Sequence, residues 1–344
     1  MHRSLISTSL AATSALLVAG VLSGCEKPSD PTPAAPAAVS AAPSAAKASA
    51  ATDHDQIITT FYPTEYFASR ISGGLIRVSC PVPADADPIF WKPSDADIAR
   101  YQHADMIIIN GAEYEKWVAS ASLPLTHIVD TAHPFDAQFL RFQGVTHSHG
   151  AAGAHTHTGV DGHTWMDPVQ ATTQAKEILS AMTRKWPEHE RAFAANYAAL
   201  EADLAKLDQR WQRLAPALKA ARLYASHPAY GYPARRYGCT IANVTLPPDE
   251  PASEATWAEL AAAVAKEPPS ASGPRVMLFE STPLDATVQQ LAAKHQMAAV
   301  VFSPCETLDP ADRAKGEDFL SVMNANLDHL EHAATGAAKA PNPG

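Results

Sequence analysis

Residues Pro187–Leu214, PEHERAFAANYAALEADLAKLDQRWQRL, indicate how this chain is built. Their larger apolar side chains recur in steps of four and three: Phe193, Tyr197, Leu200, Leu204, Leu207, Trp211 and Leu214. This spacing places them on one face of an α-helix, and Pro187 suits its first turn. The stripe fits a coiled-coil dimer or a long helix packed within its own chain. Because it spans few heptads, it favours the second.

Short β-branched runs alternate with amphipathic stretches on both sides of this helix. Strands are expected at Gln56–Tyr62, Ile76–Val82, Met106–Ile109, His127–Val129, Ala221–Ala225, Ile241–Val244, Arg275–Phe279 and Ala298–Phe302. Helices are expected at Thr64–Ile71, Asp95–Gln102, Glu113–Ser120, Tyr230–Tyr237, Ser253–Lys266, Leu284–His295 and Asp318–His332. The alternation predicts an α/β fold of two (βα)n lobes with parallel sheets, joined by one long helix across a cleft.

The composition excludes two broad classes of protein. The chain has 344 residues, of which 46% are hydrophobic and 18% charged. It can therefore form a packed core, which argues against a globally disordered protein. Its formal net charge is −10, which argues against a nucleic-acid-binding protein because such proteins present a basic face.

The first residues have the pattern of an export signal. A short polar start with His2 and Arg3 precedes the apolar stretch Leu5–Leu22, and small residues lead to Cys25. Leu22-Ser23-Gly24-Cys25 resembles the lipobox of bacterial lipoproteins, in which the cysteine is lipidated. The alternative is an ordinary signal peptide with a chance cysteine. Residues 26–54 are rich in Ala, Pro and Ser and are expected to form a disordered linker.

Three cysteines follow in the body: Cys80, Cys239 and Cys305. In an exported protein this odd number allows at most one disulfide. Cys239 and Cys305 fall in the same half of the chain and are the tentative pair. Because there is no C-x-x-C motif, nothing supports a thiolate zinc knuckle or thioredoxin-type chemistry.

A histidine-rich segment, THSHGAAGAHTHTG, carries His147, His149, His155 and His157. It lies within residues 143–162, which show neither helical nor strand periodicity and are expected to form a loop. Several imidazoles on one loop can chelate zinc, copper or nickel. A polar loop with chance histidines is the alternative.

Three further residues are candidate metal ligands. His163 stands in the segment DGHTWMDP at 161–168, and His227 follows a predicted strand in SHPAYGYPARRYG at 226–238. Glu280 ends the predicted strand RVMLFE, where loops of parallel sheets usually bind ligands. Taken singly, each histidine could be structural. Glu280 could be a ligand, an orienter of a ligating imidazole, or a helix cap.

Together, these segments resemble the zinc/manganese-specific solute-binding lipoproteins of ABC importers, over about Asp55 to His332. The resemblance implies that His163 and His227 are the second and third metal ligands. The chain departs from the family at two positions: Ile89, in DPIFWKP at 87–93, replaces the first ligand, and Ser303 takes the place of the usual Asp. Since neither side chain is a good metal ligand, at least one histidine of the histidine-rich segment is expected to complete the shell.

The predicted function is capture of a divalent metal, zinc first, for delivery to the membrane permease of an ABC importer. Neutral imidazoles suit zinc, with manganese, copper and nickel as lesser candidates. The protein is expected to be monomeric, without enzymatic activity, and anchored in the periplasm or cell envelope through Cys25. The alternatives are a periplasmic zinc hydrolase, for which no H-E-x-x-H or G-x-S-x-G motif is found, and a metal chaperone or adhesin on the same fold.

The expected organisation divides the chain into seven segments. They are a lipoprotein signal peptide (1–25), the linker (26–54), an N-terminal α/β lobe (55–142), the histidine-rich loop (143–162), a linking helical segment (163–215), a C-terminal α/β lobe (216–334) and a frayed tail (335–344).

Overall fold

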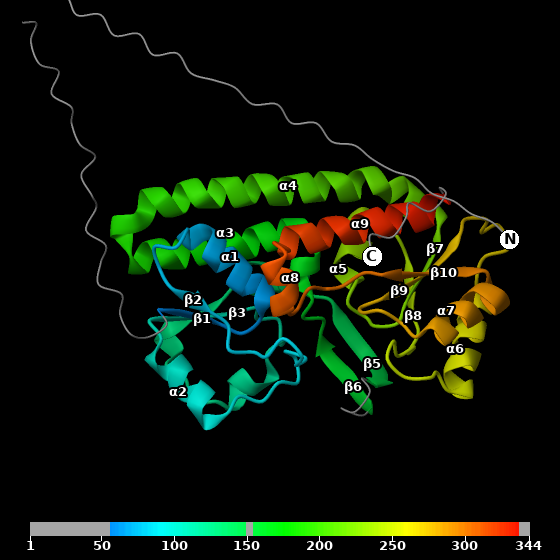
Figure 1. Ribbon diagram of the computed structural model, residues 1–344, viewed down its shortest axis with the longest axis horizontal. Helices are drawn as coiled ribbons and strands as arrows, with labels where there is room; N and C mark the ends of the chain where they lie inside the picture. Colours follow the sequence, from blue (N-terminus) through cyan, green and yellow to red (C-terminus); the bar gives the residue numbers. More distant parts are fainter. Residues whose placement is uncertain (1–55, 149–153, 337–344) are drawn as a thin grey trace, which may run out of the picture. The chain divides into compact units, whose positions relative to one another are not determined.

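The computed structural model describes residues 56–148 and 154–336, and it describes side chains within these ranges except at 142–158 (Figure 1). The predicted signal peptide with Cys25, all of the predicted linker, and His149 lie outside the described residues. Within the described ranges, we find no helix that is both long and apolar enough to span a bilayer.

The N-terminal lobe contains a parallel four-stranded sheet in the order β2-β1-β3-β4. Its strands are β1 (Ile57–Thr59), β2 (Val78–Ser79), β3 (Met106–Ile109) and β4 (Ile128–Asp130). Alternate residues of the central strands pack on opposite faces. Ile57 and Ile108 belong to the core cluster with the helices α1 (Tyr62–Ser72) and α3 (Pro168–Lys185), whereas Ile58 and Ile107 belong to the cluster with α2 (Asp95–His103). Both faces are therefore covered, as parallel sheets require.

Helices α1 (Tyr62–Ser72) and α2 (Asp95–His103) flank this sheet. The helix α2 begins with a capping box, in which the Ser94 side chain accepts from the Asp97 amide and the Asp97 carboxylate accepts from the Ser94 amide. The helix expected over Glu113–Ser120 is instead a short 3-10 turn, Lys116–Ser120. Positive φ angles at Ala112 (52°) and Glu113 (58°) place these residues in the left-handed region, which prevents an α-helix from starting there.

The C-terminal lobe has a second parallel sheet, in the order β10-β9-β7-β8. Its strands are β7 (Arg222–Ala225), β8 (Ile241–Asn243), β9 (Arg275–Phe279) and β10 (Met297–Val301). Its helices are α5 (Gly231–Tyr237), α6 (Glu254–Ala265), α7 (Asp285–Gln290) with a π-helical turn at Leu291–His295, α8 (Pro310–Ala314) and α9 (Phe319–Thr335). The prediction of two parallel-sheet lobes is confirmed.

The predicted long linking helix is present, and a second helix precedes it in the linking segment. The helix α3 (Pro168–Lys185) packs along α4 (Glu190–Ala220), and the short turn Trp186–His189 reverses the chain between them (Figure 1). The separate helix α3 escaped prediction because its buried side includes Ala171, Gln174 and Ala175, which give little apolar contrast.

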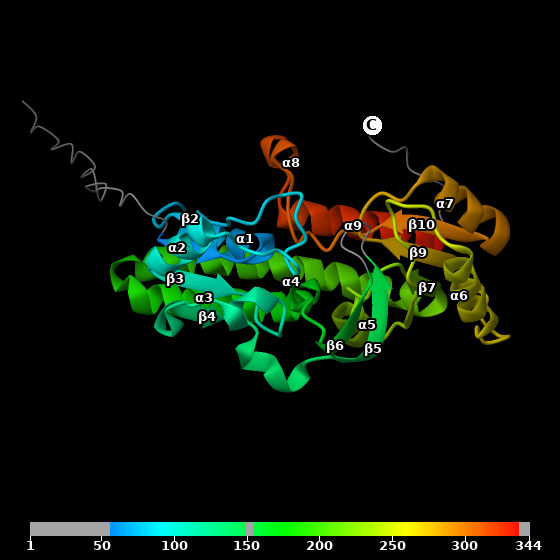
Figure 2. The ribbon, with the colours of Figure 1, turned by 90° about the horizontal axis from the view of Figure 1, so that it is seen from below.

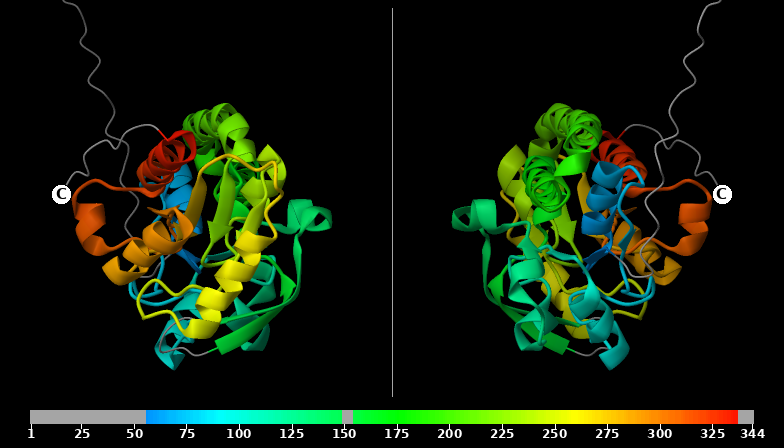
Figure 3. Two further views of the ribbon diagram at one scale, coloured as in Figure 1. Left: turned by 90° about the vertical axis from the view of Figure 1, so that its right-hand side faces the viewer. Right: turned by 90° about the vertical axis from the view of Figure 1, so that its left-hand side faces the viewer.

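The long helix α4 packs within its own chain. All seven apolar residues of its stripe are buried in the core cluster shared with α1, α3 and α9, so the coiled-coil alternative is not needed to explain them. The two sheets lie at opposite ends of α4, and α3 and α9 each run along α4, α3 beside its first half and α9 beside its second (Figures 2 and 3). The helix also continues through Pro216 to Ala220, beyond the predicted end at residue 215. A proline removes one backbone donor but does not break this helix.

The histidine-rich segment was predicted as a loop, but most of it forms a β-hairpin. Its two sides form antiparallel strands, β5 (Arg141–Ser148) and β6 (Ala154–Val160), in which His147 pairs with His155. Val145 and Thr146 precede the first histidine, and Thr156 and Thr158 flank His157. These β-branched residues favour extended backbone, while the glycines and alanines of the segment interrupt any apolar periodicity.

The tentative disulfide between Cys239 and Cys305 is wrong. Both thiols are free, as is that of Cys80. Cys305 is buried in the core cluster, and Cys239 follows the C-terminal Gly238 of α5 and packs against the same cluster. Burial raises the pKa of both thiols, so they remain protonated at neutral pH.

Candidate metal centre

His163 is held by a turn that follows strand β6. The Oδ1 atom of Asp161 accepts from the backbone amide of His163 (3.0 Å) and lies 2.8 Å from its Nδ1 atom. Asp161 is itself fixed, because its backbone carbonyl accepts from the hydroxyl of Tyr232 (2.6 Å). The carboxylate therefore orients the ring and directs its Nε2 atom towards the C-terminal lobe, as carboxylates behind metal-binding histidines do.

The atom that faces this Nε2 atom belongs to Glu306, a residue that the sequence analysis missed. The Oε1 atom of Glu306 lies 3.1 Å from His163 Nε2. Both atoms are buried, and they form an ion pair when the imidazole is protonated. An imidazole nitrogen and a carboxylate oxygen that face each other at this distance can share a cation, either the proton of the imidazole or a metal ion in its place.

The local backbone explains how Glu306 reaches this position. Cys305 adopts a left-handed conformation (φ 58°), which is uncommon for a residue other than glycine. The carbonyl of Glu306 accepts from the amide of Tyr62 (3.0 Å), which ties the loop to the N-terminal lobe. Such strained backbone tends to accumulate at functional sites.

Ser303, the predicted replacement for the fourth ligand, has a structural role. Its backbone amide donates to Oδ1 of Asn326 (3.1 Å), its carbonyl accepts from the Asn326 side chain (2.7 Å), and its hydroxyl oxygen accepts from the amide of Cys305 (3.1 Å). The loop nevertheless carries a carboxylate that faces His163. The carboxylate stands three residues later, at Glu306, the first acidic residue after β10.

His227 and Glu280 come from neighbouring strands of the C-terminal sheet. His227 follows β7 and Glu280 follows β9, and these strands pair directly. The Nδ1 atom of His227 lies 3.7 Å from Oε2 of Glu280. The carboxyl ends of parallel strands meet at one edge of the sheet, which is why the two residues are adjacent.

The two candidate histidines lie close together. Their ring centres are 5.3 Å apart, with an interplanar angle of 79°. A zinc ion bound through a ring nitrogen at ~2.0–2.1 Å lies about 3 Å from the ring centre, so rings at this separation can share one ion. Within the described residues, however, no three His, Cys, Asp or Glu side chains already converge tightly enough to hold a metal ion. The arrangement is therefore two pairs, His163 with Glu306 and His227 with Glu280.

The surroundings of His163 favour positive charge. Burial alone would lower its pKa, but the carboxylates of Asp161 and Glu306 outweigh this effect and raise the pKa to about 10. The imidazole is therefore protonated at neutral pH in this arrangement. A metal ion that binds Nε2 takes the place of that proton between the same carboxylates.

Aromatic residues enclose the site and connect the lobes. Trp165 is only 1% exposed, and its indole N–H donates to the carbonyl of Pro304 (2.8 Å). Tyr114 packs against Trp165 (ring centres 5.0 Å apart) and near His163 (6.1 Å). This apolar enclosure lowers the local dielectric and strengthens the electrostatic interactions of the site.

Ile89 contributes no metal ligand. It is 6% exposed and lines a small space of about 20 Å³ together with Tyr114, His163 and Pro228. Ile89, which replaces the family's first ligand, thus lies next to His163, but its side chain has only apolar carbon atoms.

His147, His155 and His157 belong to the hairpin β5–β6, and His149 lies outside the described residues. The structure does not describe the side chains at 142–158.

Two parallel-sheet lobes, a helical linker and a histidine–carboxylate site where the lobes meet define a bilobed α/β binding protein for a cation. The chain belongs to the family described as ZnuA, zinc-uptake complex component A, periplasmic, whose model matches residues 57–333. This assignment confirms the family resemblance. The family's description, a component of an uptake complex, agrees with a binding protein rather than an enzyme.

The chain is similar to characterised members of this family. It is 28% identical over 297 residues to the zinc-binding protein AdcA of Streptococcus pyogenes serotype M3, covering 83% of this chain and 57% of AdcA. It is 28% identical over 283 residues to the high-affinity zinc uptake system protein ZnuA of Bacillus subtilis, covering 81% of this chain and 87% of that protein. The chain thus spans little more than half the length of its AdcA relatives.

A solved structure shows the same fold. The crystal structure of the metal-dependent lipoprotein YcdH from Bacillus subtilis superposes with a TM-score of 0.68 at 26% identity. The match covers 80% of this chain and 98% of that structure.

Proposed function

We propose that this protein captures zinc outside the cytoplasm and delivers it to the permease of an ABC importer. The observation that carries the proposal is the buried contact between Nε2 of His163 and Oε1 of Glu306, which lie 3.1 Å apart. Membership of a periplasmic zinc-uptake family supports the metal and the destination.

The proposed ligands are His163, His227 and Glu306, with Glu280 as a fourth ligand or as the orienter of His227. Two imidazoles and one or two carboxylates form a donor set that suits zinc, which usually takes four ligands. The carboxylates also leave manganese as a competitor, because it prefers oxygen ligands. Since two side chains follow strands of the C-terminal sheet and one follows β6, both lobes would share the ion.

Zinc titration of the metal-free full chain tests the proposal. His163→Ala and His227→Ala should each weaken zinc binding by orders of magnitude, because each removes a coordinate bond. His189→Ala, outside the site at the start of α4, is the matched control and should bind as the parent does. Unchanged affinity in both site variants would reduce these residues to structural histidines.

A hydrolase is the competing function for a histidine–carboxylate zinc site. It needs an open coordination position and a general base. A screen of the zinc-loaded protein against ester, phosphoester and peptide substrates should show no turnover. Turnover that is lost in His163→Ala would overturn the transport proposal. A chaperone or adhesin on the same fold would bind zinc equally well. Its function would not depend on a permease, so deleting the permease genes would leave that function intact.

We propose that Cys25 anchors the protein to the membrane. Signal cleavage before this residue would leave a modifiable cysteine at the new N-terminus, followed by the Ala/Pro-rich segment. Cys25→Ala should move the protein from the membrane fraction to the soluble fraction. Retention in the membrane fraction would refute lipid anchoring.

A further inference from the structure

Glu306, the proposed zinc ligand after β10, lies on a connection that rests on the opposite lobe. The connection joins β10 to α9 and contains the short helix α8, so both of its ends belong to the C-terminal lobe. We call residues 303–315 the Glu306 segment. Figure 1 shows its helix α8 beside α1, the first helix of the N-terminal lobe. The segment therefore crosses the boundary between the lobes, and its contacts there decide where Glu306 lies.

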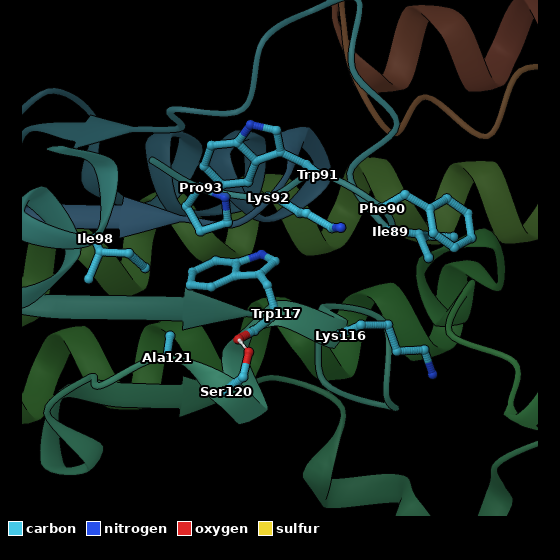
Figure 4. Close-up of a pocket in the computed structure, with 10 residues that line it drawn as sticks. All are labelled: Ile89, Phe90, Trp91, Lys92, Pro93, Ile98, Lys116, Trp117, Ser120 and Ala121. Atoms are coloured by element: carbon cyan, nitrogen blue, oxygen red, sulfur yellow. Dashed lines mark hydrogen bonds between the residues drawn. The ribbon is translucent and has the colours of Figure 1, made fainter. Parts of the chain in front are cut away.

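Two hydrogen bonds hold the middle of the Glu306 segment on the N-terminal lobe. The amide of Tyr62, at the start of α1, donates to the carbonyl of Glu306 (3.0 Å). The hydroxyl of Thr307 donates to the carbonyl of Ala84 (3.0 Å). Ala84 belongs to the connection after β2 that continues to Ile89 and the pocket beside it (Figure 4). The backbone at Glu306 is thus attached to the N-terminal lobe, although it follows a strand of the C-terminal sheet.

The side chain of Arg313, on α8, adds a third attachment. Its Nη2 atom lies 2.8 Å from Oε2 of Glu65, in the first turn of α1. Its guanidinium carbon lies 4.3 Å from the centre of the Tyr62 ring. Arginine suits both contacts at once, because its planar cation can pair with a carboxylate while it covers an aromatic face. Tyr62 therefore binds Glu306 through its amide and Arg313 through its ring.

The helix α8 depends on such attachments for its position. It has five residues, and isolated helices shorter than ~12–15 residues are marginally stable in water. The neighbouring ion pair of Lys315 with Asp312 (2.9 Å) joins two residues of the same segment. The pair of Arg313 with Glu65 instead joins residues 248 positions apart in the sequence. The Arg313 side chain is 42% exposed, so a substitution there can remove the attachment without opening the core.

We propose that Arg313 is a positioning residue for the zinc ligand Glu306. Its contacts with Glu65 and Tyr62 keep the Glu306 segment docked on α1, where the carboxylate faces Nε2 of His163 at 3.1 Å. Because a docked carboxylate does not have to be ordered when the ion arrives, docking strengthens zinc binding and slows zinc release. The inference rests on the proposed zinc function, since it gives Arg313 a part in the same site.

Hydrogen exchange of the Tyr62 amide tests the docking in the metal-free full chain. This amide is protected by the Glu306 carbonyl, so it reports on the segment without any zinc. Arg313→Gln and Glu65→Gln should each speed its exchange about fivefold, the upper range for an exposed ion pair. Lys315→Gln, which removes a charge from the same segment, is the matched control and should exchange as the parent does. An unchanged rate in Arg313→Gln would overturn the proposal.

Zinc binding and release test the positioning role. Competition with a chromophoric chelator should show about fivefold weaker binding for Arg313→Gln and for Glu65→Gln, chiefly through faster release. The double variant should lose no more than Arg313→Gln alone, because the two side chains act through one contact. In a Glu306→Gln background, Arg313→Gln should cause no further loss, because the ligand that it positions is already gone. Lys315→Gln should bind zinc as the parent does.

The possible outcomes separate positioning from a merely structural role. If exchange at Tyr62 becomes faster while the zinc affinity stays at the parent value, Arg313 holds the segment without positioning a ligand, and the proposal is overturned. An equal loss with and without the Glu306 carboxylate would also overturn it. His163→Ala in the same series distinguishes this proposal from the zinc proposal. If His163→Ala loses zinc binding while Arg313→Gln retains it, only the positioning role fails; if His163→Ala binds as the parent does, the zinc site itself is wrong.

Discussion

The Nε2 atom of His163 and the Oε1 atom of Glu306 lie 3.1 Å apart, and they come from opposite lobes of the protein. One follows strand β6 and the other follows strand β10, so only the folded chain brings them together. Asp161 fixes the far side of the same imidazole. A line of carboxylate, imidazole and carboxylate therefore crosses from one lobe to the other.

Replacing Glu306 with Gln should weaken zinc binding by about 10-fold or more. The amide keeps the size of the side chain but loses the negative charge that would neutralise and coordinate the cation. Calorimetric titration of zinc into metal-free protein measures the change. Ser303→Ala is the control on the same loop and should retain the parent affinity, because Ser303 binds Asn326 rather than the site. If Ser303→Ala weakened zinc binding and Glu306→Gln did not, Ser303 rather than Glu306 would be the ligand.

Asp161→Asn should lower zinc affinity about 10- to 100-fold, the usual effect of removing a carboxylate behind a metal-binding histidine. The amide can still accept from the His163 ring, but it does not stabilise charge on the bound imidazole. Competition with a chromophoric zinc chelator measures this change. Asp136→Asn, at an exposed position on the N-terminal lobe, is the control. If Asp161→Asn and Asp136→Asn bind zinc equally well, Asp161 stabilises only the turn before His163.

Acid should destabilise the protein through Glu267. Its carboxylate binds Arg275 and Arg222 at 2.8 Å and accepts from the hydroxyl of Tyr224, and these contacts, led by Arg275, lower its pKa from 4.5 to about 2. A depressed pKa contributes stability that is fully present above pH 4.5 and is lost as the pH falls towards 2. Glu267→Gln should therefore lower the melting temperature by a few degrees at pH 7 and reduce its dependence on pH between 4.5 and 2.

Thermal unfolding followed by circular dichroism between pH 2 and 7 checks this prediction. Glu259→Gln, on the exposed side of α6, is the control and should follow the parent curve. If Glu267→Gln also follows the parent curve, the arginine contacts contribute no net stability.

The strands were predictable because burial leaves a direct mark on the sequence. Met106–Ile109 and Arg275–Phe279 were predicted with the observed bounds, since strands covered on both faces need continuous apolar runs. The stripe of α4 was equally clear, because leucines and aromatic residues repeat with the helical period. The helix α3 was hidden by its buried glutamines, of which Gln174 donates to Asn110 (2.8 Å) and Thr131 (2.9 Å).

The site was only partly predictable. His163 and His227 stand in recognisable segments, whereas Glu306 depends on a left-handed residue in an irregular loop. Local sequence does not specify such a conformation at Cys305, because nonglycine residues adopt it only where tertiary contacts impose it. The available signal was position: Glu306 is the first acidic side chain after a strand whose carboxyl end faces the site.

Deleting Gly144–Gly159 should leave the strongest phase of zinc binding unchanged and remove weaker phases. The sequence predicted a ligand from this segment because Ser303 left the shell short of donors, and Glu306 is the donor that we propose instead. We therefore propose that His147, His149, His155 and His157 bind separate, weaker ions. Calorimetry with circular dichroism as a check of folding decides the matter. Loss of the strongest phase in a folded deletion variant would show that the segment supplies a ligand to the shared ion.

Ile89→His should strengthen zinc binding about 10-fold or more. Residue 89 lines the small space beside His163, so an imidazole there can add a third nitrogen ligand to a set that otherwise relies on carboxylates. In metal-free protein, the same imidazole is buried among apolar groups, which should cost about 1–3 kcal/mol. The melting temperature should therefore fall without zinc and rise with it, because a ligand stabilises the state that binds it more tightly.

Ile89→Leu keeps the apolar character and should change neither the zinc affinity nor the difference between the melting temperatures with and without zinc. If Ile89→His binds zinc no more tightly than Ile89→Leu does, residue 89 does not face the ion, and the site draws its ligands elsewhere.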